Sequence, residues 1–185
     1  MAAEFAGLRS KVSAEALLVH KEDAGYEEAR AGRCFGARVA DRFPAAICLC
    51  KTTSDVQACV QFANANALKL SVRSGGHNWF NCSLRSGSLL IDVGDMKHVK
   101  IQKEKGRAVV GPGAPGGALQ AALQEQGLFF PTGHCFTTPV GGFLIGGGYG
   151  LGQERYGLSC NSIVGLEVVT PDGRVLHCGE AGEGG

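Results

Sequence analysis

The sequence predicts an α+β protein built from two subdomains, and three observations support this. A strand–helix–strand pattern spans residues 45–72, shorter strands and one helix follow from residue 97, and glycines cluster between residues 106 and 152. Glycine makes up 29 of 185 residues, about twice the ordinary ~7%, which indicates ligand-binding loops rather than a linker. The expected divisions are a leader with a short helix (residues 1–38), a first subdomain (39–96) and a second subdomain (97–185).

The first subdomain is predicted from an apolar run and a helix signal. Residues 45–50 are continuously apolar, as is typical of a buried strand. Ser54 is expected to cap the next helix, because Gln57 stands at the capping-box position. A strand at 68–72 then leads into a glycine-rich loop and should be parallel to the first strand. A further strand is expected at 88–93.

The second subdomain is predicted from weaker patterns. Strands are expected at 97–102 and 107–111, followed by a helix at 115–126 that Gly127 ends. Two more strands, near 163–170 and 174–178, are joined by the turn sequence Pro171-Asp172-Gly173. Residues 180–185 are expected to be a loop.

Composition excludes several classes of partner. A net charge of +1 without a basic block argues against nucleic acid. No apolar run reaches the ~18 residues that span a bilayer, so no membrane partner is expected. Eight cysteines without framework spacing, and no readable signal peptide, predict reduced thiols in an intracellular compartment. The oligomeric state stays open.

Two glycine-rich loops each carry one nucleophilic side chain. The first runs from Ser71 to Trp79 and contains His77. The second begins Thr132-Gly133-His134-Cys135 and continues into further glycines. Such loops can point successive N–H groups at an anion. Each loop alone has an ordinary alternative, because His77 can be a surface histidine and Cys135 an inert thiol.

Together the loops resemble the FAD-binding domain of the vanillyl-alcohol oxidase and p-cresol methylhydroxylase superfamily, berberine-bridge-enzyme-like branch. The resemblance covers roughly residues 40–178 and includes the Arg155-Tyr156-Gly157-Leu158 segment. Two residues depart from it: Pro139 stands where glycine is usual and Phe143 where histidine is common. The resemblance implies a PCMH-type FAD-binding domain with the cofactor between its two α+β subdomains, truncated at the C-terminus.

The resemblance also implies the binding residues. His77 would attach to the 8α-methyl of the flavin and Cys135 to C6, with attachment through His77 alone and a noncovalent reductase as alternatives. A neutral imidazole and a thiolate are the reactive forms. The implied cofactor-binding residues are Arg73, Ser74, Gly75, Gly76, His77 and Asn78 for the pyrophosphate, His134, Cys135, Gly141, Gly142, Gly146, Gly147, Gly148 and Gly150 around the flavin, and Ile163 and Val168 on the adenine side.

The implied activity is that of an FAD-dependent oxidoreductase. It would take a hydride from a CH–OH or similar C–H donor of a small-molecule substrate and pass electrons to oxygen. No catalytic base is identified between residues 1 and 185. The alternative is a non-catalytic FAD-binding fragment or module that lacks the substrate domain.

Other chemical signatures are rejected. Gly111 to Gly116 fits G-x-G-x-x-G, but Pro112 and Pro115 lack N–H donors, and the acid expected ~20 residues on is missing. No Gly-Lys dipeptide or Gly-x-Ser-x-Gly motif occurs, which excludes a P-loop and a nucleophile elbow. Cys48 and Cys50 share one strand face without a histidine pair nearby, so no zinc site is predicted.

Overall fold

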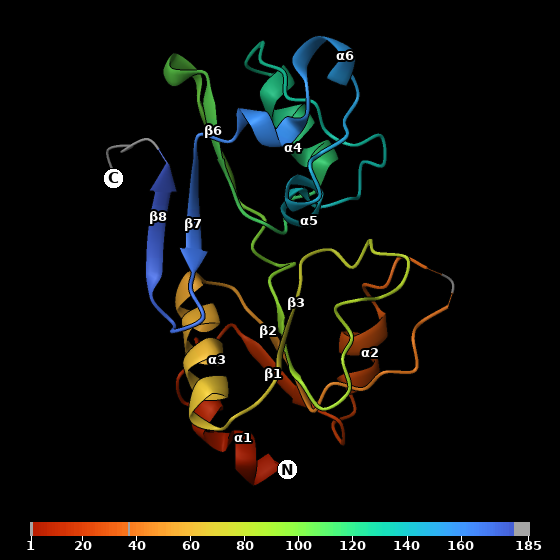
Figure 1. Ribbon diagram of the computed structural model, residues 1–185, viewed down its shortest axis with the longest axis vertical. Helices are drawn as coiled ribbons and strands as arrows, with labels where there is room; N and C mark the ends of the chain where they lie inside the picture. The colour runs from red at the N-terminus through yellow and green to blue at the C-terminus, as the bar shows by residue number, and fades with distance from the viewer. Residues whose placement is uncertain (1, 37, 180–185) are drawn as a thin grey trace. The chain divides into compact units, whose positions relative to one another are not determined.

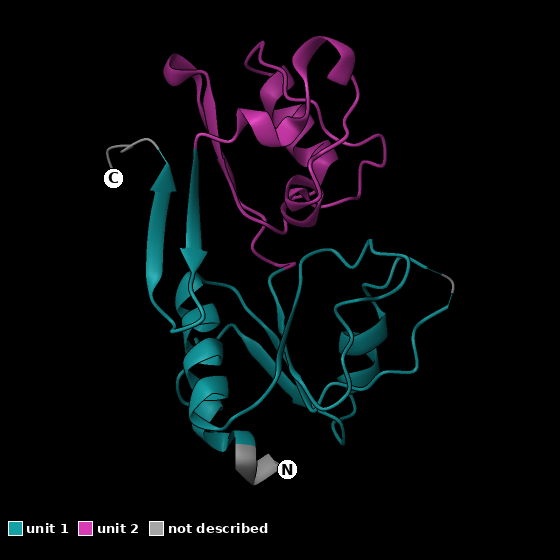
Figure 2. Cartoon of the chain, in the orientation of Figure 1, with its two compact units in different colours: residues 1–93, 165–185 teal, residues 94–164 magenta. Residues whose placement is uncertain are grey.

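The computed structural model describes residues 2–36 and 38–179, with side chains from Phe5 onward. The predicted C-terminal loop at 180–185 therefore lies outside the described residues. Figure 2 shows the two compact units of the chain. Unit 1 comprises residues 1–93 and 165–185, and unit 2 comprises residues 94–164.

A four-stranded sheet forms the centre of unit 1, in the order β1-β2-β4-β3 (Figure 1). Its strands are β1 (Leu17–His20), β2 (Ala46–Leu49), β3 (Leu70–Arg73) and β4 (Leu89–Asp92). Strands β2 and β3 both run parallel to β4, while β1 pairs antiparallel with β2. The predicted parallel orientation of the first two strands is confirmed, with β4 inserted between them.

Helices cover both faces of this sheet. They are α1 (Ala2–Arg9), α2 (Tyr26–Ala31) and α3 (Thr53–Ala65). Ile47 and Leu90 pack with Tyr26 and Ala29 of α2 in one buried cluster. The predicted leader thus contributes α1, β1 and α2 to the packed unit, where the sequence pattern had indicated one short helix and no strand.

Helix α3 begins with a capping box at Thr52 and Asp55, two residues before the predicted cap at Ser54. The Thr52 side chain accepts the N–H of Asp55, and the Asp55 carboxylate accepts the N–H of Thr52. That carboxylate also accepts the N–H groups of Ser13 and Lys51, at 2.6 and 2.9 Å. These contacts from outside the helix explain why Thr52 and Asp55, rather than Ser54 and Gln57, form the box.

A hairpin of β7 (Gly165–Val169) and β8 (Val175–Gly179) also belongs to unit 1. Its turn docks on α3: Gln57 Nε2 donates to the Gly173 carbonyl at 2.9 Å, and Asn64 Nδ2 donates to the Pro171 carbonyl at 2.7 Å. Sequence patterning had placed this hairpin in the second subdomain. The side chains of α3, distant in sequence, assign it to the first unit.

Unit 2 contains an antiparallel pair, β5 (Val99–Gln102) and β6 (Arg107–Val110), joined by the short helix η1 (Lys103–Lys105). Helix α4 (Gly116–Gln124) packs Leu119 and Leu123 against Ala114 and Val140. Gly127 follows it at φ +70°, in the left-handed region where glycine is favoured. The remaining helices are α5 (Val140–Ile145), α6 (Gln153–Tyr156) and η2 (Ser159–Ser162).

The helices of the described chain are all too short or too polar to cross a lipid bilayer.

Candidate functional site

The first glycine loop follows the end of β3. It contacts an earlier segment of the chain, around Arg33 and Phe35. Gly76 has a φ of +70°, and a Cβ there would lie 1.9 Å from the Arg33 carbonyl oxygen. The Phe35 N–H donates to the Gly76 carbonyl at 3.1 Å. Only glycine fits this close approach, so the loop's shape depends on residue 76.

His77 stacks on an aromatic side chain. Its ring lies 4.5 Å from that of Phe35 at an interplanar angle of 20°, and Trp79 contacts Phe35 edge-on. Burial lowers the pKa of His77, which favours the neutral imidazole. A neutral ring nitrogen is a nucleophile. The sequence did not indicate Phe35 because it lies in the predicted leader.

Arg73 has a structural side chain. Its Nε donates to Asp92 Oδ2 at 2.7 Å and its Nη1 to the Arg30 carbonyl at 2.7 Å, with the guanidinium almost fully buried. Arg33 also pairs with Asp92, at 3.4 Å. The Arg73 side chain therefore ties β3 to β4 and to α2. The expected pyrophosphate contact at this position concerns the backbone and is unaffected.

The rest of the first loop is half-buried. Residues 74–77 have intermediate exposure, and Asn78 is exposed. The Asn78 Oδ1 accepts the N–H groups of Phe80 and Cys82, at 3.0 and 3.3 Å. Asn78 therefore closes the turn that follows the loop.

Cys135 lies among threonine hydroxyls in the second loop. Its Sγ is 3.4 Å from Thr137 Oγ1, and its own side chain is half-exposed. Hydrogen bonds from the Thr137 and Thr138 side chains lower the pKa of the Cys135 thiol. The thiolate is therefore more accessible at this position than in an ordinary exposed cysteine. The neighbouring His134 is exposed.

The turn at 111–117 supports the second loop. The N–H groups of Gly116 and Gly117 donate to the carbonyls of Thr138 and Phe136, both at 2.9 Å. The Gly141 N–H donates to the Pro112 carbonyl at 3.0 Å, and a Cβ at Gly141 would lie 2.7 Å from that oxygen. Donors that a Rossmann-type loop would offer to a pyrophosphate are thus used within the protein.

The later glycines of the second loop fall into two groups. A Cβ at Gly148 would lie 2.7 Å from Ser159, and one at Gly150 would lie 2.2 Å from the Pro131 carbonyl. These two glycines allow chain segments to pack closely. A Cβ at Gly142 would have no described heavy atom within 4 Å, and one at Gly147 would meet only Tyr149. Gly142 and Gly147, together with the exposed Gly146, are therefore the positions open to a ligand.

The two residues expected on the adenine side lie in different units. Ile163 follows η2 in unit 2 and is half-buried, whereas Val168 lies in β7 of unit 1 with 38% of its surface exposed. Each position is accessible within its own unit.

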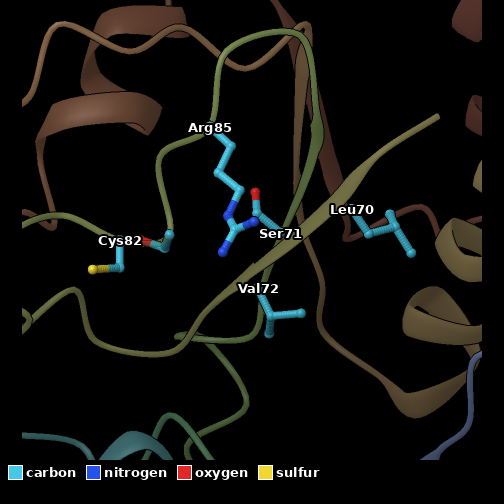
Figure 3. A pocket seen from close by; sticks show the side chains of 6 residues that line it. Leu70, Ser71, Val72, Cys82 and Arg85 are labelled. Atoms are coloured by element: carbon cyan, nitrogen blue, oxygen red, sulfur yellow. The ribbon is translucent and has the colours of Figure 1, made fainter.

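A pocket of about 400 Å³ lies beside β3 in unit 1 (Figure 3). It contains none of the predicted site residues. Its lining residues are Leu70, Ser71 and Val72 of β3 and Cys82, Ser83 and Arg85 of the following loop.

Comparison with known proteins places these loops in a wider context. A family model described as an FAD binding domain matches residues 44–179. FAD-linked oxidoreductase ptmO from Penicillium ochrochloron is 33% identical over 174 residues, which cover 94% of this chain and 38% of that protein.

Two solved structures have the same fold over nearly the whole chain. The 6-hydroxy-D-nicotine oxidase of Arthrobacter nicotinovorans has a TM-score of 0.85 and 29% identity, covering 92% of this chain and 37% of its own. Wild-type BBE-like 1 of Physcomitrella patens has a TM-score of 0.85 and 28% identity, covering 95% and 37%. The chain therefore spans little more than a third of the length of each of these three proteins.

Proposed function

Because the chain belongs to the FAD binding domain family, we propose that it forms the FAD-binding part of an oxidoreductase, with His77 and Cys135 attached covalently to the flavin. FAD-linked oxidoreductases among its relatives support the general activity. The proposal of two covalent attachments is based on the side-chain environments of His77 and Cys135 in this chain.

The thiol of Cys135 is the observation that carries the proposal. Covalent attachment through sulfur requires a thiolate, and the Thr137 and Thr138 hydroxyls stabilise that form. A cysteine kept for packing alone needs no such hydroxyls.

His77 has the complementary property. Attachment through a ring nitrogen requires neutral imidazole, and burial against Phe35 favours that form. The stacked ring of Phe35 also restricts the rotation of His77. Phe35 is therefore a positioning residue for the attachment.

Backbone geometry fits the rest of the cofactor. Gly76 holds the first loop in a conformation that brings it against Arg33, while Gly142 and Gly147 leave space for a ligand at the second. Glycine loops of this kind accept phosphate oxygens and flat ring systems at close range.

When bound, the flavin accepts a hydride from the substrate, and a C–H bond beside a hydroxyl or similar group is the proposed donor. Oxygen is the proposed final acceptor. The residues of this chain hold the flavin by backbone donors and by two side-chain attachments, which prevent its loss between turnovers.

A second candidate is an FAD-binding module without turnover of its own. It is favoured by the sequence itself, in which no catalytic base was identified. An oxygen electrode with a panel of alcohols, sugars and amines separates the two candidates, since only the first consumes oxygen with a donor.

The test of attachment uses acid precipitation of the natural protein and its variants. We expect the yellow colour to stay with the precipitate in the natural protein and in Cys160→Ala, a half-buried thiol of the same unit as Cys135. His77→Ala and Cys135→Ala should each keep a single attachment, identified by mass spectrometry of flavin-bearing peptides. The double variant should release all flavin into the supernatant.

Two outcomes would contradict the proposal. Release of all flavin from the natural protein would show that binding is noncovalent. A flavin-bearing peptide that contains neither His77 nor Cys135 would show that other residues form the attachment.

A further inference from the structure

Three cysteine thiols meet in the interior of unit 1, away from both glycine loops in sequence. Cys48 lies on β2, Cys50 directly follows it, and Cys59 lies on α3. Their sulfur atoms all lie within 4.8 Å of one another, and those of Cys48 and Cys50 are 3.7 Å apart. All three residues have no exposed surface.

The cluster lies between the sheet and α3. Ile47 faces α2, and since side chains alternate along a strand, Cys48 and Cys50 point to the opposite face. Cys59 reaches them from α3, which Figure 1 shows beside the sheet. The sequence analysis treated Cys48 and Cys50 as a pair and did not include Cys59. Residues that meet across a helix–sheet contact have no fixed separation in sequence.

The nearest charged groups are already matched. Asp55 and Arg9 are the charged residues that act on Cys48. Four hydrogen bonds saturate the Asp55 carboxylate, from Ser13 N, Ser13 Oγ, Lys51 N and Thr52 N. Within the described residues, the candidate ligand group therefore contains three cysteine sulfurs and no carboxylate or imidazole.

The spacing of the sulfurs fits a single bound atom. Element–sulfur bonds of about 2.3 Å place three sulfurs about 3.3 to 4.0 Å apart as the angle between bonds widens from about 90° to 120°. The 3.7 Å between Cys48 and Cys50 lies within this interval. The distances to the third sulfur are at most 4.8 Å, so they exceed the upper end of this interval by no more than about 0.8 Å.

We propose that Cys48, Cys50 and Cys59 form a binding site for a trivalent thiophilic element, arsenic(III) or antimony(III), in the core of unit 1. With arsenous acid, three S–H bonds and three As–O bonds break, three As–S bonds form, and three water molecules leave. Arsenic and sulfur keep their oxidation states. The product is electrically neutral.

The net charge of the complex favours a trivalent element over other soft ions at this site. Three thiolates around a divalent zinc ion carry one net negative charge, and around monovalent copper they carry two. A net charge in a core without water costs several kcal/mol even after relaxation, and the charges of Asp55 and Arg9 act on Cys48 in opposite directions. Structural zinc also takes four ligands, which this group does not offer among the described residues.

Occupancy would join two elements of unit 1 through covalent bonds. Bonds from one atom to Cys48, Cys50 and Cys59 connect β2 to α3 directly. Because the thiols are fully buried, uptake requires local opening of α3 or loading before the unit has folded.

The test loads the natural protein with arsenous acid alone, both during expression and after purification. We expect one arsenic per chain to remain after gel filtration, with three sulfur neighbours in the X-ray absorption spectrum. Cys59→Ala should show at most two sulfur neighbours, because two thiols leave one As–O bond of arsenous acid in place. The matched control, Cys82→Ala, removes an exposed thiol of the same unit and should bind as the natural protein does.

Each other outcome overturns the site. Absence of retained arsenic under both loading conditions would show that the thiols are only a packed cluster. Fewer than three sulfur neighbours in the natural protein would show another binding mode, and this measurement does not depend on whether Cys59→Ala folds. Loss of arsenic in Cys82→Ala, or three sulfur neighbours in a folded Cys59→Ala, would place the binding elsewhere.

Discussion

Replacing Gly76 by alanine tests whether the first loop depends on its close approach to Arg33. Alanine at φ +70° costs about 1–2 kcal/mol, of which about 0.4–1 kcal/mol is returned by a less flexible unfolded chain. The new Cβ would also lie 1.9 Å from the Arg33 carbonyl oxygen, so the backbone must move. Forced shifts of this kind cost about 1–3 kcal/mol. We expect a total loss of about 2–4 kcal/mol in the free energy of unfolding.

Gly87 provides the matched control. It has a φ of +72°, but a Cβ there would have no described heavy atom within 4 Å. Gly87→Ala should therefore lose only about 1 kcal/mol and keep its flavin. Urea unfolding gives the stability of both variants, and the acid precipitate gives their covalent flavin. Equal losses of unfolding free energy in the two variants, with equal flavin content, would refute the reasoning. They would show that Gly76 is required for its φ alone and not for its close approach to Arg33.

Three further predictions concern single polar side chains. Thr137→Val should raise the pKa of Cys135, so flavin attachment at neutral pH should slow and its pH midpoint should move upward, as measured by flavin incorporation against pH; an unchanged profile would exclude Thr137 from thiolate stabilisation. Burial tends to raise the pKa of Asp55, but backbone donors outweigh it and the net shift is downward. The stabilisation by Asp55 is therefore complete above the unfolded-state pKa of about 3.9 and is lost as pH falls through the folded-state pKa. Asp55→Asn should flatten this acid limb of urea stability and cost about 2–3 kcal/mol at neutral pH, because its amide nitrogen cannot accept the N–H groups that now donate to Oδ2. Arg73→Met should lower the free energy of unfolding by about 3–5 kcal/mol, because the buried carboxylate of Asp92 loses its ion pair with Arg73. A small loss in the unfolding free energy would show that Arg33 compensates.

The sequence identified the elements that carry strong local signals. The apolar run before Lys51 and the glycine after α4 gave β2 and the end of that helix close to their observed positions. Strand β1 was not predicted, because four residues in a charged, alanine-rich segment carry too little pattern to indicate a strand. Its identity comes from pairing with β2, a contact that local sequence does not encode.

The same distinction applies to the candidate site. His77 and Cys135 stand in recognisable glycine-rich motifs, and the resemblance indicated them. Phe35 lies far from His77 in sequence, and its role depends on the ring contact that folding creates. Likewise the glycine motif could not separate Gly148, which is packed against Ser159, from Gly142, which faces open space.

The connectivity of the two units sets an order on synthesis. Unit 2 is an insertion, since the chain leaves unit 1 after Val93 and returns at Gly165. A ribosome adding ~5–20 residues per second needs about 4 to 14 s for residues 94–164, and the hairpin that docks on Gln57 and Asn64 is made only afterwards. During that interval the sheet and α3 must persist without the hairpin, with one side of the helix uncovered. A single proteolytic cut in either connection would also leave unit 2 covalently tethered through the other.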